Sequence, residues 1–172
     1  ALHRSSNGKI SKRPAVRWQE FQRRRPTEYE LRDWFGRGKY AGIGVVTGKV
    51  SKLVVVDIEH DAAPTDAADI SSPLESQTIN GGRHVFYRWT KPLKNTVRIQ
   101  NKPIDFRGDG GFVVLPPSQQ GERRYSWMRK MDPRKLPVLP AGIERALIRG
   151  AEPVKSSART SCDSSSSKDR ST

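Results

Sequence analysis

The middle of the chain contains short apolar segments separated by polar and glycine-rich stretches. The uncharged run at residues 53–56 consists of Leu-Val-Val-Val and predicts a buried strand that continues to Glu59. Shorter runs of the same kind predict further strands at residues 42–48, 83–90, 104–107, 111–115 and around 125–127. The pattern is therefore that of a protein built mainly from strands.

Helical patterns are few. Thr27 followed by Glu30 is a capping box that predicts a helix start, and Leu31, Trp34 and Phe35 then give the helix one apolar side. Glycines at positions 36 and 38 end it. A short helix and loop are expected within residues 61–75, and a last short helix at residues 141–148.

Strands and helices do not alternate along the chain, which favours an α+β fold with mixed or antiparallel sheets over a doubly wound sheet. Residues 14–150 have the length and patterning of one domain. Residues 1–13 are basic and polar, and we expect a loosely held arm there. Residues 151–172 are rich in serine and lack periodicity, so we expect a disordered tail.

The strand at residues 53–59 ends in two carboxylates one residue apart. Side chains two apart on a strand point to the same side, so Asp57 and Glu59 should project together. Adjacent carboxylates repel each other unless a cation lies between them, which indicates a divalent-metal site with oxygen ligands. A strand that ends in a solvated acidic turn explains the pair equally well when it is considered alone.

Charge is unevenly distributed along this basic chain, whose net charge is +14. Residues 1–52 contain 13 Lys and Arg against 4 Asp and Glu, whereas residues 53–82 contain six acids and neither Lys nor Arg. A basic surface with an acidic island suits a metal-dependent enzyme that acts on nucleic acid. The basic side chains expected to follow a nucleic-acid backbone are Lys9, Lys12, Arg13, Arg17, Arg23, Arg24 and Arg25.

Two glycine-containing segments add candidate site residues. In the first, Gly81 and Gly82 precede Arg83 and His84, so the backbone could approach a ligand beside two nitrogen-bearing side chains. In the second, Asp105 lies on a short strand before a glycine-rich turn. Each segment can also be a plain hairpin turn, with Asp109-Gly110 as the turn in the second.

Taken together, the motifs resemble those of the primase-polymerase (prim-pol) family of the archaeo-eukaryotic primase superfamily. The shared order is Asp-x-Glu at position 57, Gly-Gly-x-His ending at position 84, and Ile-Asp-x-Arg-Gly-x-Gly-Gly-Phe-Val-Val-x-Pro-Pro-Ser from position 104. The resemblance covers roughly residues 10–130. It implies a prim-pol fold with an RRM-like catalytic core and few flanking helices.

The resemblance also implies roles for individual residues. Asp57, Glu59 and Asp105 would ligate two Mg²⁺ or Mn²⁺ ions, and His84 would contact the triphosphate with help from the backbone of Gly81 and Gly82. Geometry adds two cations to this set. Arg107 should share the strand face of Asp105 and contact phosphate, whereas Arg83 should point away from His84 and ranks lower.

By the same resemblance, the partners would be a DNA template-primer, nucleoside triphosphates and a helicase domain or protein, as in plasmid, phage and mobile-element systems. The function that the resemblance implies is that of a primase or DNA polymerase, a DNA-dependent nucleotidyltransferase that adds nucleotides to a primer 3′ end by two-metal catalysis. The alternatives are a metal-dependent nuclease or phosphohydrolase, or a non-catalytic nucleic-acid-binding module. A single cysteine, Cys162, fits a reducing intracellular compartment. No signal peptide or membrane-spanning apolar run is present, and we expect no membrane partner and a monomer.

Overall fold

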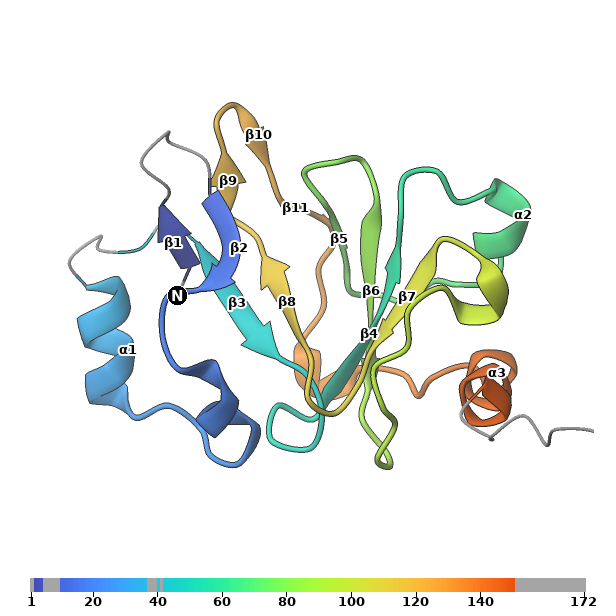
Figure 1. Cartoon of the computed structure of the whole chain (residues 1–172), viewed down its shortest axis with the longest axis horizontal. Helices are drawn as coiled ribbons and strands as arrows, with labels where there is room; N and C mark the ends of the chain where they lie inside the picture. The colour runs from blue at the N-terminus through green and yellow to red at the C-terminus, as the bar shows by residue number, and fades with distance from the viewer. Residues whose placement is uncertain (1, 5–9, 37–39, 41, 151–172) are drawn as a thin grey trace, which may run out of the picture.

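The computed structural model describes residues 2–4, 10–36, 40 and 42–150 (Figure 1). The α-helices are α1 (Glu28–Phe35), α2 (Pro64–Ala67) and α3 (Ala141–Gly150). Short 3-10 helices span Trp18–Gln22, Ile99–Asn101 and Pro133–Lys135. The strands are β1 (Leu2–Arg4), β2 (Ile10–Pro14), β3 (Ile43–Val46), β4 (Leu53–Ile58), β5 (Glu75–Gln77), β6 (Arg83–Arg88), β7 (Ile104–Arg107), β8 (Phe112–Leu115), β9 (Gln119–Gln120), β10 (Arg123–Arg124) and β11 (Ser126–Arg129). None of the helices in these ranges has the length and apolar character needed to cross a bilayer.

Five strands form the central sheet, in the order β11-β5-β6-β4-β7, and each is antiparallel to its neighbours. β4 lies inside this sheet because its consecutive valines can be buried on both sides; Val54, Val55 and Val56 are at most 2% exposed. The remaining strands form three two-stranded antiparallel sheets: β1-β2, β3-β8 and β9-β10. The expected α+β class, with antiparallel sheets and few helices, is confirmed.

Different layers cover the two faces of the central sheet, because side chains alternate along each strand. On one face, Val54 and Val56 share a core cluster with Leu147 of α3. On the other face, Val55 shares a cluster with Val113 of β8. Figure 1 shows α2 and α3 on one side of the sheet and the β3-β8 pair on the other. Residues that alternate along β4 therefore face either the helices or the β3-β8 pair.

Three regions differ from the sequence expectations. Residues 2–4 and 10–14, expected within or beside a loose arm, form the β1-β2 pair, because Leu2 is an apolar anchor that is only 1% exposed. β5 follows directly after the expected helix and loop, and its buried residues Glu75 and Ser76 are polar, so no apolar alternation marks it. The β9-β10 hairpin is equally polar and was not expected. Gly38 and the expected tail, residues 151–172, lie outside the described residues.

α1 begins at the capping box that the sequence predicts. Thr27 Oγ1 accepts a hydrogen bond from the backbone N–H of Glu30 at 3.2 Å, and the Glu30 carboxylate accepts one from the N–H of Thr27 at 2.7 Å. The helix ends at Phe35, with Gly36 as its C-cap, as expected. This start is specified locally, since both bonds join residues three apart.

Aromatic side chains attach the N-terminal segments to the β3-β8 pair. The Trp18 ring lies 5.0 Å from that of Phe112 on β8, and the Phe21 ring lies 5.2 Å from that of Trp34 on α1. Phe21 is buried, while Trp18 and Trp34 are half-buried. Trp18 thus packs against β8, whereas Phe21 packs against α1.

Asp109 cross-links the loop between β7 and β8 to two other segments. Its carboxylate accepts hydrogen bonds from Trp89 Nε1 at 2.9 Å, from Leu93 N at 3.2 Å and from Lys49 N at 3.2 Å. The Asp109-Gly110 turn does not close a hairpin, because β7 and β8 belong to different sheets. The glycine-rich segment thus carries the chain from the central sheet to the β3-β8 pair.

Candidate active site

Three strands bring one polar residue each into a row across the central sheet. Asp57 on β4 is paired with His84 on β6 and with Asp105 on β7. Directly paired residues point to the same face of a sheet, so all three side chains lie on the face that turns toward β3 and β8. His84 Nε2 lies 3.5 Å from Asp57 Oδ1. The row joins residues that are far apart in the sequence.

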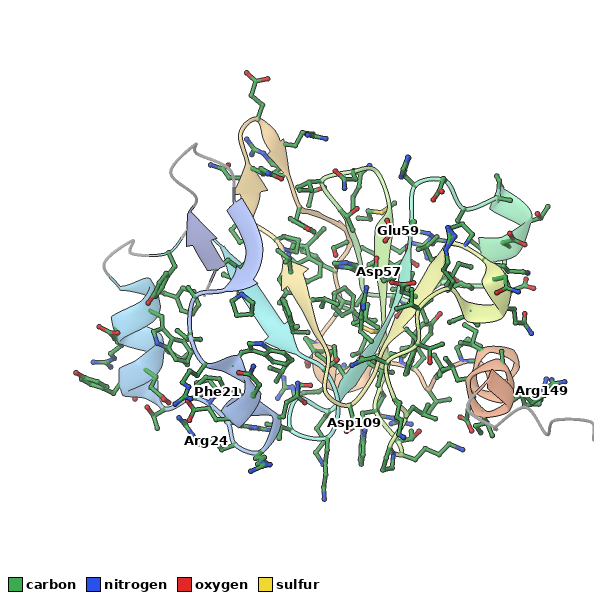
Figure 2. All side chains as sticks on the ribbon, viewed as in Figure 1. Phe21, Arg24, Asp57, Glu59, Asp109 and Arg149 are labelled. Atoms are coloured by element: carbon green, nitrogen blue, oxygen red, sulfur yellow. The ribbon has the colours of Figure 1, made fainter. Side chains whose placement is uncertain are left out.

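Glu59 extends the row to a cluster of three carboxylates. It follows Asp57 by two positions and lies one residue beyond the end of β4, which is shorter by one residue than the strand expected to reach Glu59. Figure 2 labels the two residues close together. Carboxylate oxygens of Asp57, Glu59 and Asp105 lie within 4.8 Å of one another. Asp105 is buried, Asp57 is half-buried and Glu59 is exposed, so the cluster opens to solvent at the end of the strand.

These donors fit a hard divalent cation. Carboxylate oxygens are the ligands that Mg²⁺ and Mn²⁺ prefer, and negative charges this close need positive charge between or beside them. Neighbouring groups supply part of it: Arg107 Nη2 lies 2.7 Å from Asp105 Oδ2 and 3.6 Å from Asp57 Oδ2. The backbone N–H of Arg98 also donates to Asp105 Oδ1 at 2.9 Å, which orients that carboxylate.

Tyr125 belongs to this site, although the sequence analysis did not assign it there. Its ring stacks on His84, with ring centroids 6.0 Å apart and an angle of 28° between the planes. Burial raises the pKa of the Tyr125 hydroxyl to about 12, and the negative charges of Asp57 and Glu59 contribute to the rise. The available signal was the strand expected around residues 125–127, which does not indicate the face of the sheet that the Tyr125 ring occupies.

A second aromatic ring positions the imidazole from another direction. Phe86, two residues after His84 on β6, meets it edge-on with ring centroids 6.3 Å apart. His84 is 5% exposed, so its orientation is set by Tyr125, Phe86 and Asp57 together. A side chain held this way can present one nitrogen in a constant direction.

Gly81 and Gly82 lie next to Glu59 but also have structural reasons to be glycine. Gly81 has φ +88° in a turn in which its N–H donates to Thr78 O at 3.1 Å. A Cβ on Gly82 would lie 2.4 Å from Ile58 O, so glycine permits the close approach of β6 to the end of β4. Both glycines line a cavity of about 340 Å³ together with Glu59, Arg83 and residues of α2, and the lining includes none of Asp57, His84 and Asp105.

Arg83 lies on the other face of the sheet. Its guanidinium contacts Glu75 Oε2 at 3.1 Å and the carbonyl of Ala67 at 3.1 Å, beneath α2. The structure therefore keeps Arg83 away from the row formed by His84, Asp57 and Asp105. The alternation of side chains along the strand had indicated this separation. Its charge balances Glu75, whose side chain is 2% exposed.

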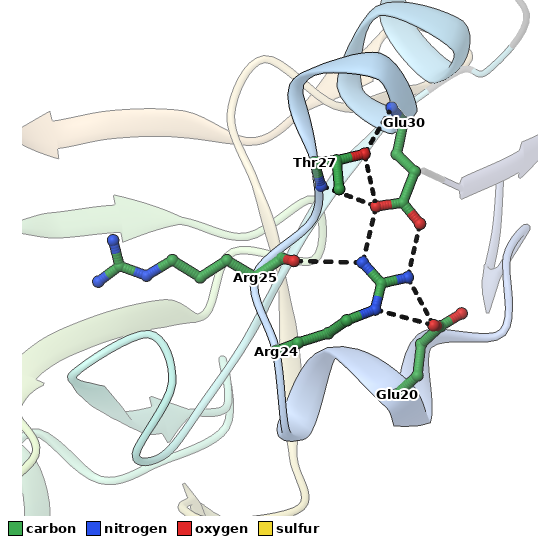
Figure 3. Close-up of polar contacts among 5 residues, drawn as sticks. All are labelled: Glu20, Arg24, Arg25, Thr27 and Glu30. Atoms are coloured by element: carbon green, nitrogen blue, oxygen red, sulfur yellow. Dashed lines mark hydrogen bonds and ion pairs between the residues drawn. The ribbon is translucent and has the colours of Figure 1, made fainter.

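Of the basic residues expected to contact nucleic acid, Arg24 is held in a local network. Its guanidinium is 2.6 Å from Glu20 Oε2 and 2.6 Å from Glu30 Oε1, and it also donates to the carbonyl of Arg25 (Figure 3). These hydrogen bonds raise the pKa of Arg24 and, with the bond from Thr27, lower the pKa of Glu30 to about 2. The positive charge of Arg24 is thus matched by two carboxylates.

The other members of that set are surface residues or lie outside what can be described. Arg17, Arg23 and Arg25 are exposed. The side chains of Lys12 and Arg13, and residue Lys9, are among those whose placement is not described. In Figure 2, Arg24 lies beside Phe21 in the N-terminal half of the molecule, well separated from Asp57 and Glu59.

Comparison with known proteins agrees with the family resemblance of the motifs. No curated protein matches the chain. The sequence profile described as "Bifunctional DNA primase/polymerase, N-terminal" matches residues 8–141, a span that includes every strand from β2 to β11 and the whole carboxylate cluster. The chain therefore belongs to the Prim-Pol family.

Proposed function

We propose that this chain is a DNA-dependent nucleotidyltransferase that adds nucleotides to the 3′ end of a primer. The observation that carries the proposal is the cluster of Asp57, Glu59 and Asp105 oxygens within 4.8 Å, in register with His84. Membership of a family of DNA primases and polymerases supports the choice of substrate. The net charge of +14 fits a polyanionic partner.

The three carboxylates would hold Mg²⁺ or Mn²⁺. The chemistry that such ions would supply when bound is a lowered pKa of the primer 3′ hydroxyl and a stabilised charge on the leaving pyrophosphate. Asp105 is oriented for this task by the N–H of Arg98, and Asp57 by its place between β6 and β7. Glu59 is the most exposed of the three.

His84 and Arg107 would act on the triphosphate. Both flank Asp57, His84 at 3.5 Å and Arg107 at 3.6 Å, so each can donate hydrogen bonds to phosphate oxygens next to the carboxylates. Tyr125 would keep the His84 ring in place and shield it from water. Gly82 lies against Glu59, and the backbone of Gly81 and Gly82 would approach the triphosphate there because neither residue has a side chain.

A metal-dependent nuclease or phosphohydrolase is the second candidate, because the same carboxylates could activate water. His84 and Arg107 beside the carboxylates favour a substrate with several phosphate charges to neutralise, which supports nucleotidyl transfer. The two functions predict opposite changes in the length of a primer. They are therefore separated by one assay.

The test is extension of a labelled primer on a DNA template with Mg²⁺ or Mn²⁺ and either ribo- or deoxyribonucleotides. Asp57→Asn is the site variant, and Asp69→Asn is the matched control, since Asp69 is an exposed acid of the same acidic stretch. We expect metal-dependent growth of the primer that falls at least about 100-fold in the site variant and is unchanged in the control. Shortening of the primer that depends on Asp57 would instead establish hydrolysis. A primer of unchanged length would mean that the chain binds nucleic acid without catalysis.

A further inference from the structure

The β9-β10 hairpin is a basic element for which the proposed site gives no role. Its two strands pair Arg123 with Gln120 and Arg124 with Gln119. Both arginines are exposed. Figure 1 shows the hairpin projecting beyond the sheets at the same end of the molecule as the turn between β5 and β6. That turn leads into β6 and His84.

The base of the hairpin is firmly attached to β3. The buried Ser118 hydroxyl accepts a hydrogen bond from Ile43 N at 2.8 Å and donates one to Ile43 O at 3.3 Å. On the other strand, Tyr125 N donates to Ser118 O at 2.8 Å. The hairpin is thus held at both of its ends, and the direction in which it projects follows from the sheets below it.

The hairpin leads directly into the site. Tyr125, which stacks on His84, immediately follows Arg124. Arg123 Nη1 lies 3.5 Å from Asn80 Oδ1, beside Gly81. A strand of nucleic acid with its end at the carboxylate cluster could therefore pass this hairpin on the exposed side of the site.

The charges of these two arginines are available to a ligand. Among the described residues, neither Arg123 nor Arg124 forms an ion pair, in contrast to Arg24, which contacts two carboxylates. The single acid of the hairpin is Glu122, in its turn. Two consecutive exposed arginines are well suited to bind phosphate, since each guanidinium can donate two hydrogen bonds to phosphate oxygens.

We propose that Arg123 and Arg124 bind the phosphodiester backbone of the DNA strand that enters the site, so that the hairpin is a DNA-contact surface. The choice of DNA as the polymer rests on the proposed function. The interaction is independent of sequence, because phosphate contacts carry no base information. Each phosphate that an arginine neutralises releases counterions, so the two arginines steepen the dependence of DNA binding on salt concentration.

The experiment measures binding of a fluorescein-labelled primer-template by anisotropy at several salt concentrations without metal. Arg123→Gln/Arg124→Gln removes both charges, and Arg123→Lys/Arg124→Lys retains them. The matched control is Arg145→Gln/Arg149→Gln, two exposed arginines on α3, which packs on the other face of the sheet (Figure 2). Circular dichroism verifies that every variant melts as the wild type does.

We expect the slope of log K against log salt to become shallower by up to about 1.8 in the glutamine hairpin variant, and to be kept by the lysine variant and by the α3 control. An unchanged slope in the glutamine hairpin variant overturns the inference. So does an equal change in the α3 control, which would reflect net charge alone. Wild-type primer extension is measured separately, so loss of the proposed function and loss of this surface are distinguishable.

Discussion

Arg107 donates a hydrogen bond to Asp105 at 2.7 Å, and the same nitrogen lies 3.6 Å from Asp57. One guanidinium thus serves two carboxylates that are paired across β4 and β7. Because a bound cation would contact the same oxygens, we expect Arg107 and a divalent ion to compensate the same negative charge. This relationship makes the site testable without any measurement of activity.

The first prediction concerns Arg107→Met. In EDTA, this variant leaves the Asp57–Asp105 pair without its guanidinium and should lower the free energy of unfolding by about 1–3 kcal/mol. Added Mn²⁺ should recover most of the loss, because the cation takes over the compensation of charge. Urea unfolding with and without Mn²⁺ measures both effects. Arg129→Met is the control, since the Arg129 side chain is 60% exposed and lies 3.8 Å from Glu75. A loss of unfolding free energy in this control as large as that in Arg107→Met would contradict the prediction.

The second prediction concerns Gly82→Ala. The new Cβ would lie 2.4 Å from Ile58 O, so β6 must move away from β4 at the position next to His84. We expect destabilisation by about 1–3 kcal/mol, together with weaker nucleotide binding. Gly142→Ala is the matched control, because its Cβ would meet nothing within 4 Å on α3, and it should be neutral or stabilising. Thermal melts compare the two, and equal melting temperatures would argue against the close approach.

The third prediction separates two aspartates of one glycine-rich segment. Asp109→Ala should destabilise the protein by about 2–3 kcal/mol, because Trp89 Nε1 and the N–H groups of Lys49 and Leu93 lose their acceptor. Mn²⁺ binding should persist, since Asp109 lies away from Asp57 and Glu59 (Figure 2). Asp105→Asn should show the reverse: weakened Mn²⁺ binding, measured by electron paramagnetic resonance. Loss of Mn²⁺ binding in the folded Asp109→Ala protein would refute this division.

The fourth prediction is a loss of stability in alkali. Burial raises the pKa of Tyr125 to about 12 and that of Tyr87 to about 12, against about 10 in the unfolded chain. The folded state holds these protons more tightly, so the stabilisation is complete below pH 10 and is lost as the pH rises through 12. Tyr125→Phe should flatten the decline between these values. Unfolding measured at intervals from pH 9 to 12 tests this, and a decline as steep as in the wild type would be evidence against a buried hydroxyl.

Local sequence was enough for several elements and for part of the site. The capping box of Thr27 and Glu30 predicts the start of α1 because its bonds span three residues. The apolar run before Asp57 predicts β4, and the alternation of a strand predicts that Asp57 and Glu59 project together. Their carboxylate oxygens do lie within 4.8 Å, although β4 ends at Ile58. The same alternation correctly separated Arg83 from His84.

Polar segments were harder to predict. Nothing apolar marks β5, whose Glu75 is buried because Arg83 on the neighbouring strand balances its charge. The β9-β10 hairpin consists of glutamines and arginines around a turn. Propensity and hydrophobic pattern carry no signal for such strands, because the partner that stabilises them is distant in the sequence.

The sequence by itself therefore determined the elements whose cause is local: β4, the capped helix, and two carboxylates on one strand face. Only the tertiary structure decided that Asp105 and His84 lie on either side of Asp57, that Tyr125 covers the imidazole and that Arg107 contacts two carboxylates. The physical reason is that strand register and the packing of layers are set by contacts between segments far apart in the chain, and these contacts leave no mark on the local pattern.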